Sequence, residues 1–137
     1  LILPARSEAE ASALDAIGVA WDFSRPAARA LASAMPLLQR AKTVRVVTVR
    51  GEKPIQTGRS ASDLARHLAC HGVEARIEEE HARGRPIGDA LDAYARSREL
   101  DLLVMGAYGH SRFRETILGG ATRSVLEGMT LPVLMAH

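Results

Sequence analysis

The chain has 137 residues, the length of one ordinary domain, of which 47% are hydrophobic and 25% charged. No apolar run approaches the roughly 18–20 residues of a membrane-spanning helix, so the composition excludes a disordered tail and argues against a membrane protein. The single cysteine, Cys70, excludes an internal disulfide and a metal site built on paired cysteines. Because no secretory leader precedes the first expected strand, we expect a cytoplasmic protein.

The charge is nearly balanced, at a formal net value of +2, but the basic residues comprise 16 arginines and only 2 lysines. Arginine suits phosphate and carboxylate groups because its planar fork binds them through two hydrogen bonds. Here the arginines are interleaved with aspartate and glutamate, which is typical of a solvated mixed-charge surface. Aromatic residues make up only 4%, too few for base-stacking platforms. The sequence therefore predicts no nucleic-acid partner.

The first residues differ from the rest of the chain. Leu1 to Leu3 form a short apolar run that stops at Pro4, and a polar stretch follows. We expect residues 1–14 to be a linker or the closing strand of a preceding domain, and residues 15–137 to form one domain. The first expected strand of that domain covers residues 16–21. Ser24 is a good N-cap for the helix that follows, and Pro26 sits in its first turn, where a missing N–H costs nothing.

Apolar runs and helical periodicity alternate along the remaining chain. The helix after Ser24 is expected to extend to about Ala41. The other expected helices cover residues 60–71, 86–98 and 121–127. The other expected strands cover residues 43–49, 73–79, 100–105 and 132–136, and the alternation of apolar and charged residues in the run 73–79 indicates an edge strand. Short strands that alternate with helices predict an α/β fold, a doubly wound parallel sheet with helices on both faces.

Ligands of such sheets bind beyond the carboxyl ends of the strands, where the strand order reverses. Gly106 and Gly109 follow the fourth strand and leave room for a ligand to approach the backbone. Gly119 and Gly120 precede a helix, whose N-terminus favours an anion. Thr122 offers a hydroxyl donor, and Arg112 and Arg114 can reach a terminal phosphate. The sequence thus predicts an anion site here.

The same segment, GAYGHSRFRETILGGAT, resembles the nucleotide-binding signature of the universal stress protein family. That signature is Gly, two residues, Gly, nine residues, Gly, then Ser or Thr, and Gly106, Gly109 and Gly119 fall in register with it. The opening VAWDFS and the closing VLEGMTLPVLMA are also similar to the family, so the resemblance covers about residues 15–137. It implies a five-stranded sheet of order 3-2-1-4-5 in the class of adenine nucleotide alpha hydrolases, with ATP, accompanied by Mg²⁺, between strands one and four.

The resemblance also implies a set of nucleotide-binding residues. The adenine and ribose would be lined by Ala20, Asp22, Val47, Met105 and Gly106. The phosphates would be held by Gly109, Gly119, Gly120, Ala121 and Thr122. Two departures stand out: Gly120 occupies the position of the signature Ser or Thr, and Phe23 replaces the usual glycine after the aspartate. We expect Phe23 and the bulky Trp21 to narrow the adenine pocket.

These observations favour an ATP-binding regulatory module of the stress response, with at most slow ATP hydrolysis, since no residue is suited to activate water. The resemblance implies a homodimer, or an intramolecular pair of domains, assembled through the last strand at residues 132–136. One alternative is a degenerate domain that has lost ATP and serves dimerisation or scaffolding. A slow ATPase is a second alternative.

Other catalytic motifs are missing from the sequence. Neither lysine follows a glycine as in a phosphate-binding P-loop, and the sequence contains no G-x-S-x-G elbow and no G-x-G-x-x-G loop. His67 and His71 are four residues apart on an expected helix, but without the glutamate of H-E-x-x-H we predict no metal site.

Overall fold

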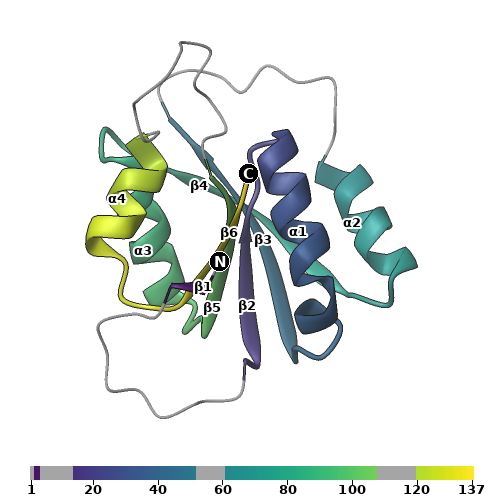
Figure 1. Cartoon of the computed structure of the whole chain (residues 1–137). Coiled ribbons are helices and arrows are strands. Elements are labelled where there is room, and N and C mark those ends of the chain that lie inside the picture. The colour runs from purple at the N-terminus through teal and green to yellow at the C-terminus, as the bar shows by residue number, and fades with distance from the viewer. Residues whose placement is uncertain (1, 4–13, 52–60, 108–119) are drawn as a thin grey trace.

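The computed structural model describes residues 2–3, 14–51, 61–107 and 120–137 of the chain (Figure 1). The described residues form helices and strands in the following order: β1 (Ile2–Leu3), β2 (Ala16–Ala20), α1 (Arg25–Leu38), β3 (Thr43–Arg50), α2 (Ala61–Cys70), β4 (Ala75–His81), α3 (Ile87–Ser97), β5 (Leu102–Gly106), α4 (Gly120–Gly128) and β6 (Val133–Ala136). The α/β alternation expected from the sequence is therefore confirmed. Helix α1 ends at Leu38, three residues earlier than its periodicity predicts, because the Arg40 N–H bonds the Leu37 carbonyl in a tighter turn.

The five long strands form a parallel sheet in the order β4-β3-β2-β5-β6. Numbered along the chain, this is the order 3-2-1-4-5 that the family resemblance implies. The short β1 adds a sixth strand beside β6 and runs antiparallel to it, with Ile2 opposite Leu134 and Leu3 opposite Val133. The alternating burial of β4 and its place at the other edge confirm the prediction of an edge strand.

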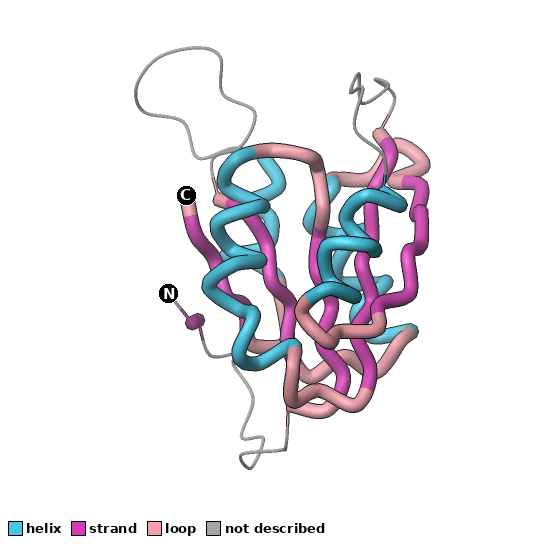
Figure 2. Tube along the Cα trace, turned by 90° about the vertical axis from the view of Figure 1, so that its right-hand side faces the viewer, coloured by secondary structure: helices cyan, strands magenta, loops and turns pink. Residues whose placement is uncertain are grey.

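Helices cover both faces of the sheet, α1 and α2 on one side and α3 and α4 on the other (Figures 1 and 2). Each face has its own core. Ile17, Val19, Leu31 and Leu64 belong to the core under α1 and α2. Val47, Leu91 and Leu103 belong to the core under α3 and α4. No helix among the described residues has the length and apolar character needed to cross a membrane.

Helix α1 begins directly after β2 because its first turn is capped as the sequence predicts. The Ser24 side-chain oxygen accepts a hydrogen bond from the Ala27 N–H at 3.1 Å. The Asp22 carboxylate accepts one from the Ser24 N–H at 3.0 Å, which turns the chain out of the strand. The end of β2 and the start of α1 are therefore held in one short, hydrogen-bonded segment.

Gly106 at the end of β5 lies against this first turn of α1. A Cβ on Gly106 would stand 2.4 Å from the Ala27 nitrogen and 2.8 Å from the Pro26 carbonyl carbon. Both atoms are backbone and cannot rotate away. The missing side chain of Gly106 therefore makes room for α1, in addition to the room for a ligand that the sequence predicts.

We predict that Gly106→Ala lowers the free energy of unfolding by about 1–3 kcal/mol, because the new methyl group overpacks two backbone groups. Urea denaturation followed by circular dichroism measures the change. Gly128→Ala is the matched control, because no atom lies within 4 Å of its added Cβ. Equal midpoints for the two variants would show that α1 shifts at no cost.

A half-buried ionic cluster ties α3 to the sheet. Glu78 on β4 pairs with Arg45 on β3 and, at 2.9 Å, with Arg98 just beyond α3. Burial raises the pKa of Glu78, but the hydrogen bond from Arg45 and the positive charges of Arg98 and Arg45 outweigh it and lower that pKa. Burial, with the neighbouring Glu78 charge, raises the pKa of Tyr94 to about 12. The cluster therefore keeps Glu78 ionised and Tyr94 neutral at physiological pH.

This cluster predicts a pH-dependent stability difference between the natural protein and Glu78→Gln. The folded-state pKa of Glu78 lies below its ordinary value of 4.5. The ionised Glu78 carboxylate therefore contributes to the free energy of unfolding at neutral pH, and this contribution is lost as the pH falls below 4.5 and through the folded-state pKa. We expect the variant to be about 1–3 kcal/mol less stable at pH 7, and we expect this difference to shrink progressively as the pH falls below 4.5 and through the lowered pKa of Glu78. Denaturant unfolding at a series of pH values measures this. A difference that does not change with pH would exclude an ionised Glu78 as its source.

Candidate functional site

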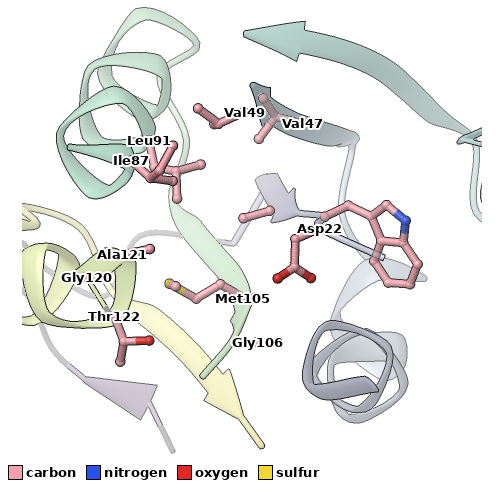
Figure 3. Close-up of a pocket in the computed structure, with 12 residues that line it drawn as sticks. Asp22, Val47, Val49, Ile87, Leu91, Met105, Gly106, Gly120, Ala121 and Thr122 are labelled. Atoms are coloured by element: carbon pink, nitrogen blue, oxygen red, sulfur yellow. The ribbon is translucent and has the colours of Figure 1, made fainter. Parts of the chain in front are cut away.

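A crevice opens at the carboxyl ends of β2 and β5, where the strand order reverses. It contains ≈ 630 Å³ of space not filled by protein, part of it open to solvent, which is within the usual range for a small-molecule site. It is lined by Ala20, Trp21, Asp22, Val47, Val49, Ile87, Leu91, Met105, Gly106, Gly120, Ala121 and Thr122 (Figure 3). Eight of the predicted site residues are in this set: Ala20, Asp22, Val47, Met105, Gly106, Gly120, Ala121 and Thr122. Four others, Gly109, Arg112, Arg114 and Gly119, lie outside the described residues.

The floor of the crevice is set by the register of three strands. Ala20 on β2 is opposite Val47 on β3 and opposite Met105 on β5. The three residues therefore lie side by side although they are far apart in the sequence. The Trp21 N–H donates to the Val47 carbonyl at 2.8 Å, which extends this pairing one residue past β2.

One wall of the crevice is apolar, and the sequence predicts only Val47 among its residues. Val49 lies two residues after Val47, so it faces the same side of β3. Ile87 and Leu91 project from α3, and Figure 3 shows them beside Val49 and Val47. The sequence contained a signal for all three, the period of two in the strand and the apolar face of the helix. It did not indicate that α3 lies beside the crevice.

The adjoining wall is the start of α4, formed by Gly120, Ala121 and Thr122 (Figure 3). Helix α4 is held against α3 by a close approach at Gly88, where a Cβ would lie 2.9 Å from the Val125 nitrogen. The Ser124 hydroxyl also donates to Asp89 at 2.7 Å. The N-terminal turn of α4 contains no acidic residue, so its partial positive charge is not offset there. This wall is suited to an anionic group.

The charges in the crevice are sparse. Asp22 is the only ionisable side chain among the described lining residues, and Figure 3 shows its carboxylate directed toward Met105 and Gly106. Thr122 is 4% exposed and lies within the fold. In the part of the chain that the structure describes, no group of three or more His, Cys, Asp or Glu side chains is arranged to hold a metal. The arrangement suits the binding of a partly apolar anion, and the described lining residues include no acid–base pair.

The expectation that Phe23 and Trp21 narrow the pocket is wrong for Phe23. Phe23 does not line the crevice, and its ring packs edge-to-face on Trp21, with centroids 6.0 Å apart. Its backbone has φ +63°, the left-handed region that the glycine of the family motif adopts without strain. A bulky residue there costs about 1–2 kcal/mol. Trp21 does line the crevice, but it also packs against the core under α1 and α2.

Comparisons with known proteins agree with this geometry. The universal stress protein family model matches residues 14–137. Universal stress protein Slr1230 of Synechocystis sp. is 45% identical over 51 residues, which cover 35% of this chain and 18% of that protein. The solved structure of hypothetical protein MJ0577 has a TM-score of 0.74 at 19% identity and covers 91% of this chain and 96% of its own.

A universal stress protein in complex with cAMP has a TM-score of 0.64 at 21% identity, covering 92% of this chain and 99% of its own. At these identities the structures establish the fold, and they agree with the observed order of the strands. The match of the family model spans nearly all of the chain, including β2, where the crevice begins, and α4, which forms one wall. The chain belongs to the universal stress protein family.

Proposed function

We propose that the crevice binds an adenine nucleotide, ATP with Mg²⁺, and that the protein is a nucleotide-dependent regulatory module. The main support is that eight residues, which the sequence and its family resemblance predict to bind a nucleotide, line the same crevice. Binding of cAMP by another member of the family adds support for an adenine nucleotide.

The two walls suit the two halves of such a ligand. The apolar wall of Val47, Val49, Ile87 and Leu91 removes the face of a purine from water. The N-terminus of α4 provides backbone N–H groups for phosphate oxygens. Gly120 lacks the hydroxyl of the signature Ser or Thr, but its N–H is retained, and a Cβ added there would meet no other described element within 4 Å.

Mg²⁺ would be held mainly by the phosphate oxygens and water, because Asp22 is the only carboxylate among the described lining residues. The Asp22 carboxylate already accepts the Ser24 N–H, so we assign it to binding and capping and not to activation of water. Hydrolysis is then incidental. The bound nucleotide instead bridges Gly106 on β5 and Gly120 on α4, which are the first and last glycines of the signature region. A partner protein would sense how the bound nucleotide holds β5 and α4 relative to one another.

This proposal predicts that Ala121→Phe weakens ATP binding at least about tenfold, because a phenyl ring enters the crevice. Titration calorimetry with ATP and Mg²⁺ measures the affinity. Ala93→Phe is the control, since Ala93 is exposed on α3 and does not line the crevice. GTP should bind more weakly than ATP if the apolar wall recognises adenine.

Three results would count against ATP-dependent regulation. Absence of binding at millimolar ATP would favour the degenerate scaffold. Equal affinities of Ala121→Phe and the natural protein would place the nucleotide elsewhere. Rapid turnover of ATP by the natural protein would favour an ATPase.

We also propose that β6 pairs with a strand of another domain, either in a homodimer, where the partner's strand takes the place of β1, or in a tandem chain. β1 already runs antiparallel to β6 there. Antiparallel is the direction that a two-fold axis imposes on a pair of identical strands. In the tandem arrangement residues 1–3 would be the closing strand of a preceding domain, as expected from the sequence; Leu1 itself lies outside the described residues.

The oligomeric state of the natural protein tests the homodimer. We expect association that rises with protein concentration, measured by size-exclusion chromatography with light scattering. A natural protein that is monomeric at all concentrations would exclude the homodimer.

A further inference from the structure

A second hollow lies between α1 and α2, on the opposite side of the segment that follows β2. It contains ≈ 850 Å³ of space not filled by protein, part of it open to solvent. We call it the α1–α2 groove. Its lining residues are Trp21, Phe23, Ala28, Leu31, Ala32, Asp63, Leu64 and His67. It shares only Trp21 with the crevice, so it is a separate feature of the surface.

The alternation of β2 continues past the end of the strand and separates the two hollows. Ile17 and Val19 face the core under α1 and α2, and Trp21 packs against that same core. Asp22 lines the crevice, and Phe23 lines the groove. Asp22 therefore faces the hollow on one side of the sheet, and Phe23 faces the hollow on the other.

The groove has an aromatic wall that the fold does not require. Phe23 keeps the left-handed backbone conformation although a glycine would adopt it without strain. In this conformation the Phe23 ring packs edge-to-face on the Trp21 indole. Strained residues that persist are concentrated at functional sites. Leu31 and Leu64 are buried beside this pair, and Ala28 and Ala32 leave the opposite side open.

The indole of Trp21 carries a second, independent indication of a ligand. Its Nε1 is buried and has no hydrogen-bond partner among the described residues. Buried donors are nearly always paired, because leaving one unpaired costs its full desolvation. Trp21 lines the groove, so an acceptor on a molecule bound there would pair with this N–H once the indole is rotated toward it. Such a molecule binds the rotated state selectively.

We propose that the α1–α2 groove is a second ligand site, which takes a neutral planar aromatic molecule that carries a hydrogen-bond acceptor. The aromatic pair and the leucines select an apolar ring, and the Trp21 N–H selects the acceptor. Asp63 and His67 are exposed at the rim, and Asp63 pairs with Arg66 at 3.5 Å, so the buried part of the groove is apolar. A charged ring would lose its hydration there.

The test uses the single tryptophan of the chain as a reporter. With ¹⁵N-labelled tryptophan, the full chain shows one indole N–H resonance, which is followed during titration with quinoline. Naphthalene is the matched probe, since it has the same shape without the ring nitrogen. We expect a saturable downfield shift with quinoline at millimolar concentration and about three- to tenfold weaker binding of naphthalene.

Three variants locate the probe. Ala32→Phe fills the groove and should abolish the shift. Ser33→Phe changes the neighbouring exposed residue, which does not line the groove, and should leave the shift unchanged. Trp21→Phe removes the N–H and should equalise the two probes in ligand-observed spectra, whether or not the protein binds ATP.

The site is overturned if quinoline causes no saturable shift, or if the shift persists in Ala32→Phe. Loss of the shift in Ala121→Phe, which fills only the crevice, would place the probe with the nucleotide and equally overturn it. Equal binding of naphthalene and quinoline by the natural protein would overturn the role of the Trp21 N–H.

Discussion

After the two central strands, β2 and β5, the chain turns toward opposite faces of the sheet, and the arrangement of the other elements depends on this. After β2 the chain turns into α1 on one face and continues toward β3. After β5 it continues to α4 on the other face and returns at β6. Right-handed crossovers leave no other choice for adjacent parallel strands whose connections run in opposite directions. A crevice at their carboxyl ends is the geometric consequence.

Gly106 shows how tightly this crossing point is packed. The first turn of α1 lies so close to the end of β5 that a single methyl group on Gly106 would meet backbone atoms. Gly88 does the same for α3 and α4, which brings the start of α4 to the crevice. The site is thus built from close backbone approaches, and its walls can move little without disturbing the helices.

Residues 21–23 separate the crevice from the α1–α2 groove. Asp22 serves the crevice and also caps the turn into α1. Trp21 and Phe23 form the aromatic wall of the α1–α2 groove. In the family motif the third of these positions is a glycine, so this wall is a feature of this chain. A ligand in either hollow contacts the same short segment, which gives a physical route for one to influence the other.

The sequence by itself determined the order of strands and helices, the edge position of β4 and the capping of α1, because these depend on local periodicity and on hydrogen bonds within a few residues. With the family resemblance it also indicated most of the described crevice residues. It did not indicate that Ile87 and Leu91 line the crevice or that Phe23 faces away from it. It also did not indicate that the first turn of α1 packs directly against Gly106. Only the tertiary structure decided these, because each depends on how closely two elements distant in sequence approach one another.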